Sequence, residues 1–156
     1  MKTLLLVILG SLAIASAQPT GQMKVDGKIV KFTNVYAYAT EGFFDKTKSD
    51  TVVFLSDRPL TDAQMHDEFG VRRLATDGKL NFVRATMNPS GQMISFLVGS
   101  PAFKAIPSGG GTEQIFEGTV DAKTIAGKVH TKGEQQFFGT KYEYEASFKL
   151  PVQARK

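Results

Sequence analysis

The chain has 156 residues, a formal net charge of +4 and no cysteine. The lack of cysteine excludes thiolate catalysis, cysteine zinc sites and a disulfide framework. The basic residues are spread among acids and the longest basic cluster is Arg72-Arg73, so the sequence has no basic surface typical of nucleic-acid binding.

The first seventeen residues have the pattern of a secretory signal peptide. Lys2 precedes an apolar run from Leu4 to Ile14, and Ala15-Ser16-Ala17 has the small-x-small ending of a cleavage site. The run is too short to span a bilayer, so we predict cleavage rather than a retained anchor. The sequence therefore predicts a leader over 1–17 and one secreted or periplasmic domain over 18–156, with no membrane span after cleavage.

The first strands of that domain are predicted around a tight turn. Asp26-Gly27 lies between two β-prone runs, and this pair is typical of a two-residue hairpin. The second arm is predicted to run on to Ala39 as one strand, with apolar side chains such as Ala37 and Tyr38 on opposite faces. Because both faces are partly apolar, we predict that this strand is central in its sheet.

A short helix is predicted over about 62–69, after a strand over 51–55. Thr61 and Gln64 have the spacing of a capping box, in which each side chain accepts from the other residue's amide. Gly70 is predicted to end the helix.

The spacing of the apolar residues predicts that one side of this helix is buried. Met65 and Phe69 are four residues apart, so they are predicted to share it. Asp67 and Glu68 would then face water.

The remaining elements are predicted to be strands. Asp77-Gly78 and Pro89-Ser90-Gly91 are turn signals, and the last run alternates apolar and polar residues with the period of a half-buried strand. The predicted strands are 80–87, 93–98, 114–120, 124–131 and 142–150. The sequence therefore predicts an all-β fold, a single antiparallel β-sandwich or barrel-like domain with one short helix.

Ser56, Asp57 and His66 are the side-chain types of a hydrolase triad. Ser56 and Asp57 are consecutive at a strand end, so their side chains start in opposite directions, and no Gly-x-Ser-x-Gly motif is present. We interpret these residues as turn and capping groups and predict no catalytic residue. A hydrolase that uses Asp57, Arg58 and His66 remains the enzymatic alternative.

A metal site is not predicted either. His66, Asp67 and Glu68 diverge by roughly 100° per residue on a helix, so they cannot converge on one ion. His130 lies about sixty residues further along the chain. We predict no metal and no cofactor.

Two aromatic doublets are the candidate contact points. Phe43-Phe44 lies in a polar loop, and Phe137-Phe138 is flanked by polar residues and glycine. Only one ring of a doublet can easily face the core, so the other is a candidate contact for a partner, an apolar ligand or a sugar ring.

Two segments, 35–60 and 124–152, resemble small secreted bacterial all-β proteins without an assigned activity. The resemblance implies a shared architecture and carries no function. The leading interpretation is a secreted or periplasmic, non-enzymatic binding module for a protein, an envelope component or a small apolar ligand. Its candidate contact residues are Phe43, Phe44, Asp57, Arg58, His66, Phe137 and Phe138. The alternatives are the hydrolase and an envelope structural protein that pairs through an open edge at 142–150.

Overall fold

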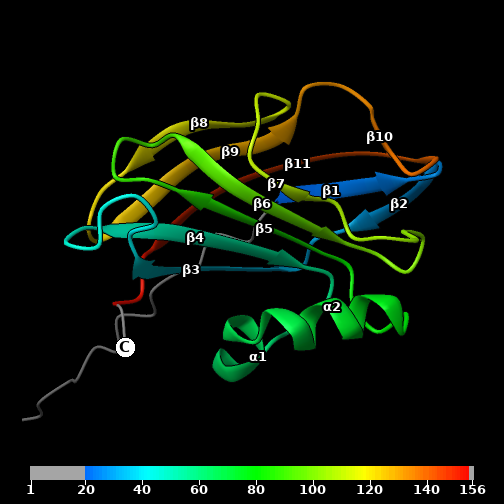
Figure 1. Cartoon of the computed structure of the whole chain (residues 1–156), viewed down its shortest axis with the longest axis horizontal. Helices are drawn as coiled ribbons and strands as arrows, with labels where there is room; N and C mark the ends of the chain where they lie inside the picture. Colours follow the sequence, from blue (N-terminus) through cyan, green and yellow to red (C-terminus); the bar gives the residue numbers. More distant parts are fainter. Residues whose placement is uncertain (1–19, 155–156) are drawn as a thin grey trace, which may run out of the picture.

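The structure is a computed structural model that describes residues 20–154, so the expected leader over 1–17 lies outside the described residues. The described chain forms two antiparallel sheets, with two short helices on one side (Figure 1). The all-β prediction is confirmed.

One sheet contains the strands from the two ends of the described chain, and the other contains the strands from its middle. The first, which we call the uncovered sheet, has the order β2-β1-β11-β9-β8, and β10 also pairs with β11. Its strands are β1 (Thr20–Val25), β2 (Lys28–Lys31), β8 (Gln114–Val120), β9 (Thr124–Thr131), β10 (Gln135–Phe137) and β11 (Thr140–Pro151). The second, which we call the helix-covered sheet, has the order β3-β4-β5-β6-β7. Its strands are β3 (Asn34–Glu41), β4 (Ser49–Ser56), β5 (Phe82–Met87), β6 (Met93–Gly99) and β7 (Ser108–Gly109).

The sheets face each other across a shared apolar core, so the fold is a sandwich. Met23 and Val129 from the uncovered sheet and Val53 and Val98 from the helix-covered sheet are all buried in it. A backbone bridge between Tyr38 and the segment after β11, at Gln153, also joins the edge of β3 to the end of the other sheet.

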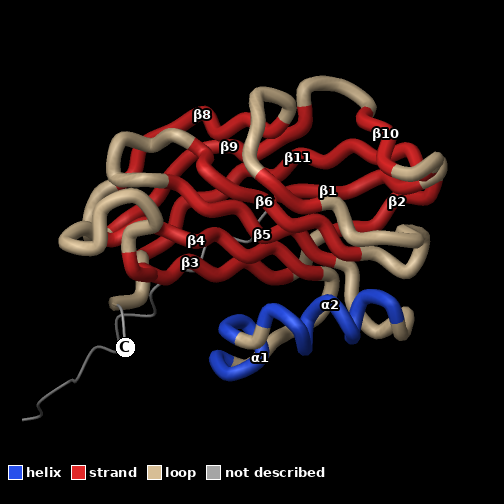
Figure 2. Tube along the Cα trace, viewed as in Figure 1, coloured by secondary structure: helices blue, strands red, loops and turns tan. Residues whose placement is uncertain are grey.

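A second apolar core lies on the outer face of the helix-covered sheet. Helices α1 (Asp62–His66) and α2 (Glu68–Thr76) run along one side of the molecule (Figure 2). Met65 and Val71 of these helices pack with Phe54 and Phe82 of the sheet. The helix-covered sheet therefore packs against an apolar core on each of its faces.

The tight turn at Asp26-Gly27 is confirmed, since both residues have positive φ and join β1 to β2. The predicted long second arm is wrong, because it breaks into β2 and β3 in different sheets. The amide of Phe32 donates to the Gly21 carbonyl in the uncovered sheet, whereas the amide of Thr33 donates to Ser56 in the other sheet. β3 is an edge strand, not a central one, and both its faces are apolar because the helices cover the outer one.

The capping box is confirmed. The Gln64 amide donates to Thr61 Oγ1 over 3.2 Å, and the Thr61 amide donates to Gln64 Oε1 over 2.9 Å. The single helix over 62–69 is wrong, because a second helix begins after Asp67. The Asp67 carboxylate accepts the Gly70 amide over 2.9 Å. Gly70 therefore lies in the first turn of α2 and does not end α1, and a Cβ there would collide with Asp67 Oδ2.

The predicted buried side is half right. Met65 is buried, but Phe69 is 81% exposed. The chain leaves helical geometry at Asp67, where φ is −95° and ψ is 87°, so the four-residue spacing no longer places the Met65 and Phe69 side chains on one side.

The alternation predicted for 142–150 is confirmed, with Tyr142, Tyr144 and Phe148 buried against the core. β11 pairs with β1 on one side and with β9 and β10 on the other. Over 142–147 the strand is paired with β1 along one side and contacts β9 and β10 along the other, so this part of β11 is not the open edge that the structural-protein interpretation requires.

Candidate functional site

The two aromatic doublets differ. Phe137 is partly buried against the core and Phe138 is 71% exposed, so this doublet has one ring on each side, as predicted. Phe43 and Phe44 are both exposed, at 72% and 77%, and their rings meet edge to face with centroids 5.0 Å apart. The loop between β3 and β4 therefore offers two rings to solvent.

Asp57 and Arg58 form hydrogen bonds and an ion pair at the end of β4. The Asp57 carboxylate accepts the Asn81 backbone amide over 2.9 Å and its side-chain amide over 2.8 Å. The Ser56 hydroxyl donates to the Arg58 carbonyl over 2.7 Å, and Arg58 Nε lies 3.7 Å from Asp57 Oδ1. These contacts link the end of β4 to the residue before β5, which is the turn role expected from the sequence.

His66 lies in a different group of side chains. Its Nδ1 is 2.8 Å from the Asp62 carbonyl, and its ring lies over Tyr38 with centroids 4.4 Å apart. The Asp57 carboxylate contacts Asn81 and Arg58 instead. The described contacts therefore do not bring His66 together with Asp57 and Arg58.

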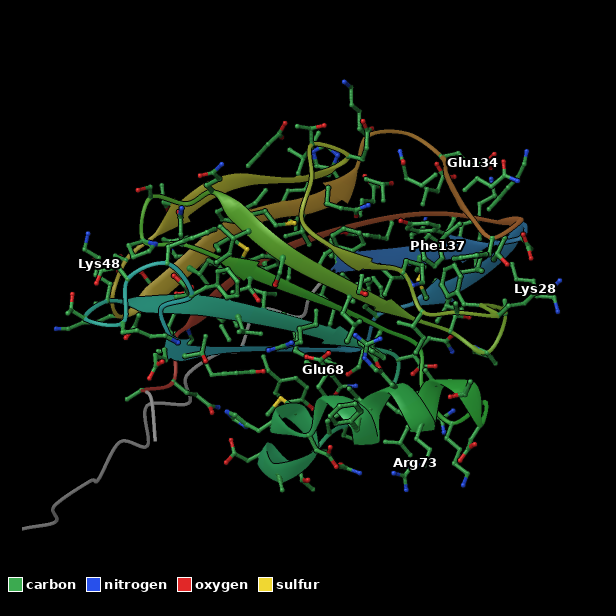
Figure 3. All side chains as sticks on the ribbon, viewed as in Figure 1. Lys28, Lys48, Glu68, Arg73, Glu134 and Phe137 are labelled. Atoms are coloured by element: carbon green, nitrogen blue, oxygen red, sulfur yellow. The ribbon has the colours of Figure 1, made fainter. Side chains whose placement is uncertain are left out.

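Arg84 is the functional candidate that the sequence analysis missed. In the strand register it lies beside Phe54 and Leu97, so it is a charged residue on the apolar outer face of the helix-covered sheet. Its Nη1 lies 3.2 Å from Glu68 Oε2 of α2. Figure 3 shows Glu68 between the helix layer and the sheet. The helices thus supply the counter-charge that a shielded guanidinium requires.

The guanidinium of Arg84 keeps one donor unused. Its Nε is buried and has no hydrogen-bond partner among the described residues. A buried donor without an acceptor destabilises the protein by about 1–3 kcal/mol, and native structures rarely keep one without a ligand or water. The same guanidinium acts on Tyr38, because burial raises the pKa of the Tyr38 hydroxyl and Arg84 opposes that rise.

Arg84 lines a hollow of about 300 Å³ on the outer face of the helix-covered sheet, which we call the Arg84 hollow. Its other lining residues are Thr40, Glu41, Phe43, Lys46, Asp50, Thr86, Ile94 and Ser95. This volume is at the lower end of the range for small-molecule sites. Phe43 is thus the one expected contact residue that lines this hollow.

The loop between β3 and β4 holds Phe43 at the rim. The Phe43 amide donates to Asp50 Oδ2 over 2.8 Å, and the Gly42 amide donates to the Lys48 carbonyl over 3.0 Å. Asp45 accepts the Thr47 amide over 3.0 Å. These bonds close the loop on itself, so the ring is presented by an ordered backbone.

The Arg84 hollow mixes donors and acceptors without an excess of either charge. Arg84 and Lys46 are cations, Glu41 and Asp50 are anions, and Lys46 also pairs with Glu41. An anionic ligand would meet the carboxylates, and a cationic ligand would meet the guanidinium and the ammonium. A neutral ligand with several hydroxyl groups avoids both conflicts, because each hydroxyl can accept from a cation and donate to a carboxylate.

One sequence signal could have identified this site. Within 82–87 Arg84 is the one charged residue in a run of Phe, Val, Ala, Thr and Met. Charged residues are almost never buried without a partner, so an arginine inside such a strand predicts either an exposed face or a paired site. Choosing between the two requires the position of α2, which local sequence does not give.

Across residues 20–154 no group of three or more His, Asp or Glu side chains is arranged to hold a metal ion. In the same part of the chain no helix combines the length and the apolar character needed to cross a membrane. Comparison of the chain with protein-family models, curated proteins and solved structures finds no match.

Proposed function

We propose that this chain is a non-enzymatic binding domain that holds a neutral polyhydroxylated ligand, a sugar, in the Arg84 hollow. Among the partner classes expected from the sequence, an envelope component that carries sugar rings fits this chemistry. We also place the domain outside the cytoplasm on the leader pattern alone, which an intact mass beginning at Gln18 would test.

A single observation carries the proposal: paired charges and an exposed aromatic ring meet in one hollow. Charge-assisted hydrogen bonds to hydroxyl groups are stronger than neutral ones, and the lining contains the cationic residues Arg84 and Lys46. The exposed face of Phe43 offers apolar surface for the C–H face of a sugar ring. Asp50 and Arg84 keep hydrogen-bonding capacity for a ligand, because a carboxylate can accept more than the one bond from the Phe43 amide and a guanidinium has more donors than the one that faces Glu68.

The test uses the two neighbouring phenylalanines as a matched pair. Both rings are exposed, but Phe43 lines the Arg84 hollow and Phe44 is absent from its lining. Glucose, galactose, N-acetylglucosamine and their short oligosaccharides are titrated into the protein while amide NMR shifts are followed. We expect Phe43→Ala to weaken the binding of the best sugar by about tenfold or more, and Phe44→Ala to change it by less than about threefold.

Two results would contradict this proposal. One is that the wild-type protein binds none of these sugars at millimolar concentration. The other is that Phe43→Ala and Phe44→Ala weaken binding equally, since the Arg84 hollow would then not be the site.

A further inference from the structure

The open edges of the two sheets differ in how well they are protected against pairing. Backbone groups along an open edge can pair with another strand, and lysines, short strands or covering segments prevent this. β2 has four residues with a lysine at each end, and β7 has two residues. Gln153 covers part of the β3 edge through backbone hydrogen bonds with Ala37 and Ala39. β8, the remaining edge, has seven residues and contains neither lysine nor proline.

Every second residue of β8 turns its backbone groups away from β9. In an antiparallel pair, hydrogen-bonded and non-hydrogen-bonded residue pairs alternate along the strands. The Glu113 carbonyl accepts the Lys132 amide over 2.8 Å, so in this register the odd-numbered residues of β8 bond to β9. The amides and carbonyls of Phe116, Gly118 and Val120 therefore point to the open edge. Within residues 20–154, β9 is the one strand that pairs with β8.

The middle of β8 is open to water. Glu117, Gly118 and Thr119 are exposed, whereas Phe116 and Val120 are partly buried against the core. Gly118 has no side chain, so its exposed surface is backbone. Figure 1 shows β8 along the outer margin of the uncovered sheet. Another strand can therefore approach β8 closely at Gly118.

We propose that β8 pairs with β8 of a second copy of this chain, antiparallel and about a two-fold axis at Gly118. Charge selects this centre from the three exposed residues. A centre at 117 would place Glu117 opposite Glu117 of the second copy, and a centre at 119 would place it opposite Asp121. Like charges directly opposite each other destabilise a strand pair. With the centre at Gly118, Glu117 lies opposite Thr119 instead.

The same register also suits the open backbone groups and the core side chains. Gly118 pairs with Gly118 of the second copy, and Phe116 pairs with Val120, so all three edge-facing residues exchange hydrogen bonds. Phe116 and Val120 both pack against the core between the sheets, so their side chains extend that apolar layer across the axis. The contact is symmetric and uses the open edge of both copies, so it closes at a dimer.

This interface is separate from the Arg84 hollow, which lies on the other sheet. It also gives the structural-protein alternative an open edge at β8 in place of 142–150.

Sedimentation velocity of the purified protein from about 10 µM to 1 mM measures the pairing. We expect a reversible dimer with a dissociation constant of about 10–300 µM, because an edge-to-edge interface is small. Amide hydrogen exchange at both ends of this range locates the interface. Exchange at Gly118 and Val120 should slow by at least about threefold at the higher concentration. Exchange at Ile29, whose amide faces the open side of β2, should not change.

Thr119 allows two opposite substitutions at the interface. It is exposed and lies opposite Glu117 of the second copy, so Thr119→Glu should weaken dimerisation by about fivefold, and Thr119→Lys should strengthen it by about threefold. Ser147 is the matched control, because it is exposed on the same outer face but lies in β11, between β1 and β9. Ser147→Glu and Ser147→Lys should each change dimerisation by less than about twofold.

Thermal unfolding of each variant confirms that it is folded. The proposal is overturned if the protein stays monomeric at about 1 mM, or if dimerisation leaves exchange at Gly118 and Val120 unchanged. It is also overturned if Thr119→Glu and Thr119→Lys shift the dissociation constant in the same direction, because no carboxylate would then lie opposite Thr119.

Discussion

The outer faces of the two sheets differ in how exposed their charged side chains are and in which elements supply the opposite charge. On the uncovered sheet, Lys128 lies 2.8 Å from Glu145 and Lys24 lies 3.3 Å from Glu143, all open to water. On the helix-covered sheet, Arg84 stands among apolar side chains and takes its counter-charge from a helix. The charges of the first face follow strand alternation and pair with one another at the surface. The shielded arginine of the second lines the hollow that we propose as a binding site.

The largest expected effect comes from removing a ring under the helices. Phe82 is fully buried and stacks on Phe54 with centroids 5.2 Å apart, and a Cβ at Gly99 would collide with it. Phe82→Ala should lower the free energy of unfolding by about 3–5 kcal/mol, because it leaves a cavity between sheet and helices. Ile29 is 61% exposed on the uncovered sheet, and Ile29→Ala should cost less than about 0.5 kcal/mol. Urea unfolding measures both, and equal losses would show that the helices do not form a second core.

An intermediate effect is expected at the shielded ion pair. Glu68 contacts both Arg72 and Arg84, and Glu68→Gln should destabilise the protein by about 1 kcal/mol, a modest value because Glu68 is half exposed.

Arg84→Met replaces the charge with an apolar side chain of similar length on an apolar face, so the stability should hardly change. The same variant should abolish sugar binding in the NMR titration. A large stability loss in Arg84→Met would instead assign the arginine a structural role.

The parts of the fold that were predictable are those set by neighbouring residues. The positive φ angles at Asp26-Gly27, the capping box at Thr61 and the alternation in β11 each depend on a few consecutive side chains. A local rule therefore identifies each of them.

The parts that sequence reasoning missed depend on contacts between distant segments. The crossing at Phe32-Thr33 is decided by which carbonyl accepts each amide, at Gly21 in one sheet and at Ser56 in the other. The outer face of β3 is apolar because the helices cover it, although β3 is an edge strand. Central strands are often apolar on both faces as well, so the sequence pattern of β3 does not distinguish the two positions. Phe43 was a candidate because it is an aromatic residue in a polar loop, whereas Arg84, which lines the same hollow, becomes a candidate only once the position of α2 is known.

The smallest expected effect is on the uncovered face, and it depends on pH. The hydrogen bond from Lys128 holds the pKa of the Glu145 carboxyl below its usual range. A carboxyl group with a lowered pKa in the folded state stabilises the protein above its unfolded pKa, and this contribution is lost as the pH falls through the folded value. Glu145→Gln should therefore slightly flatten the stability curve below about pH 4.5 and leave the stability at pH 7 almost unchanged, since exposed pairs contribute little. Urea unfolding from pH 3 to pH 7 measures this, and added salt should shrink the difference between the two proteins. If Glu145→Gln destabilised the protein at pH 7 as strongly as Glu68→Gln, the ion pairs on the two outer faces would contribute equally to stability.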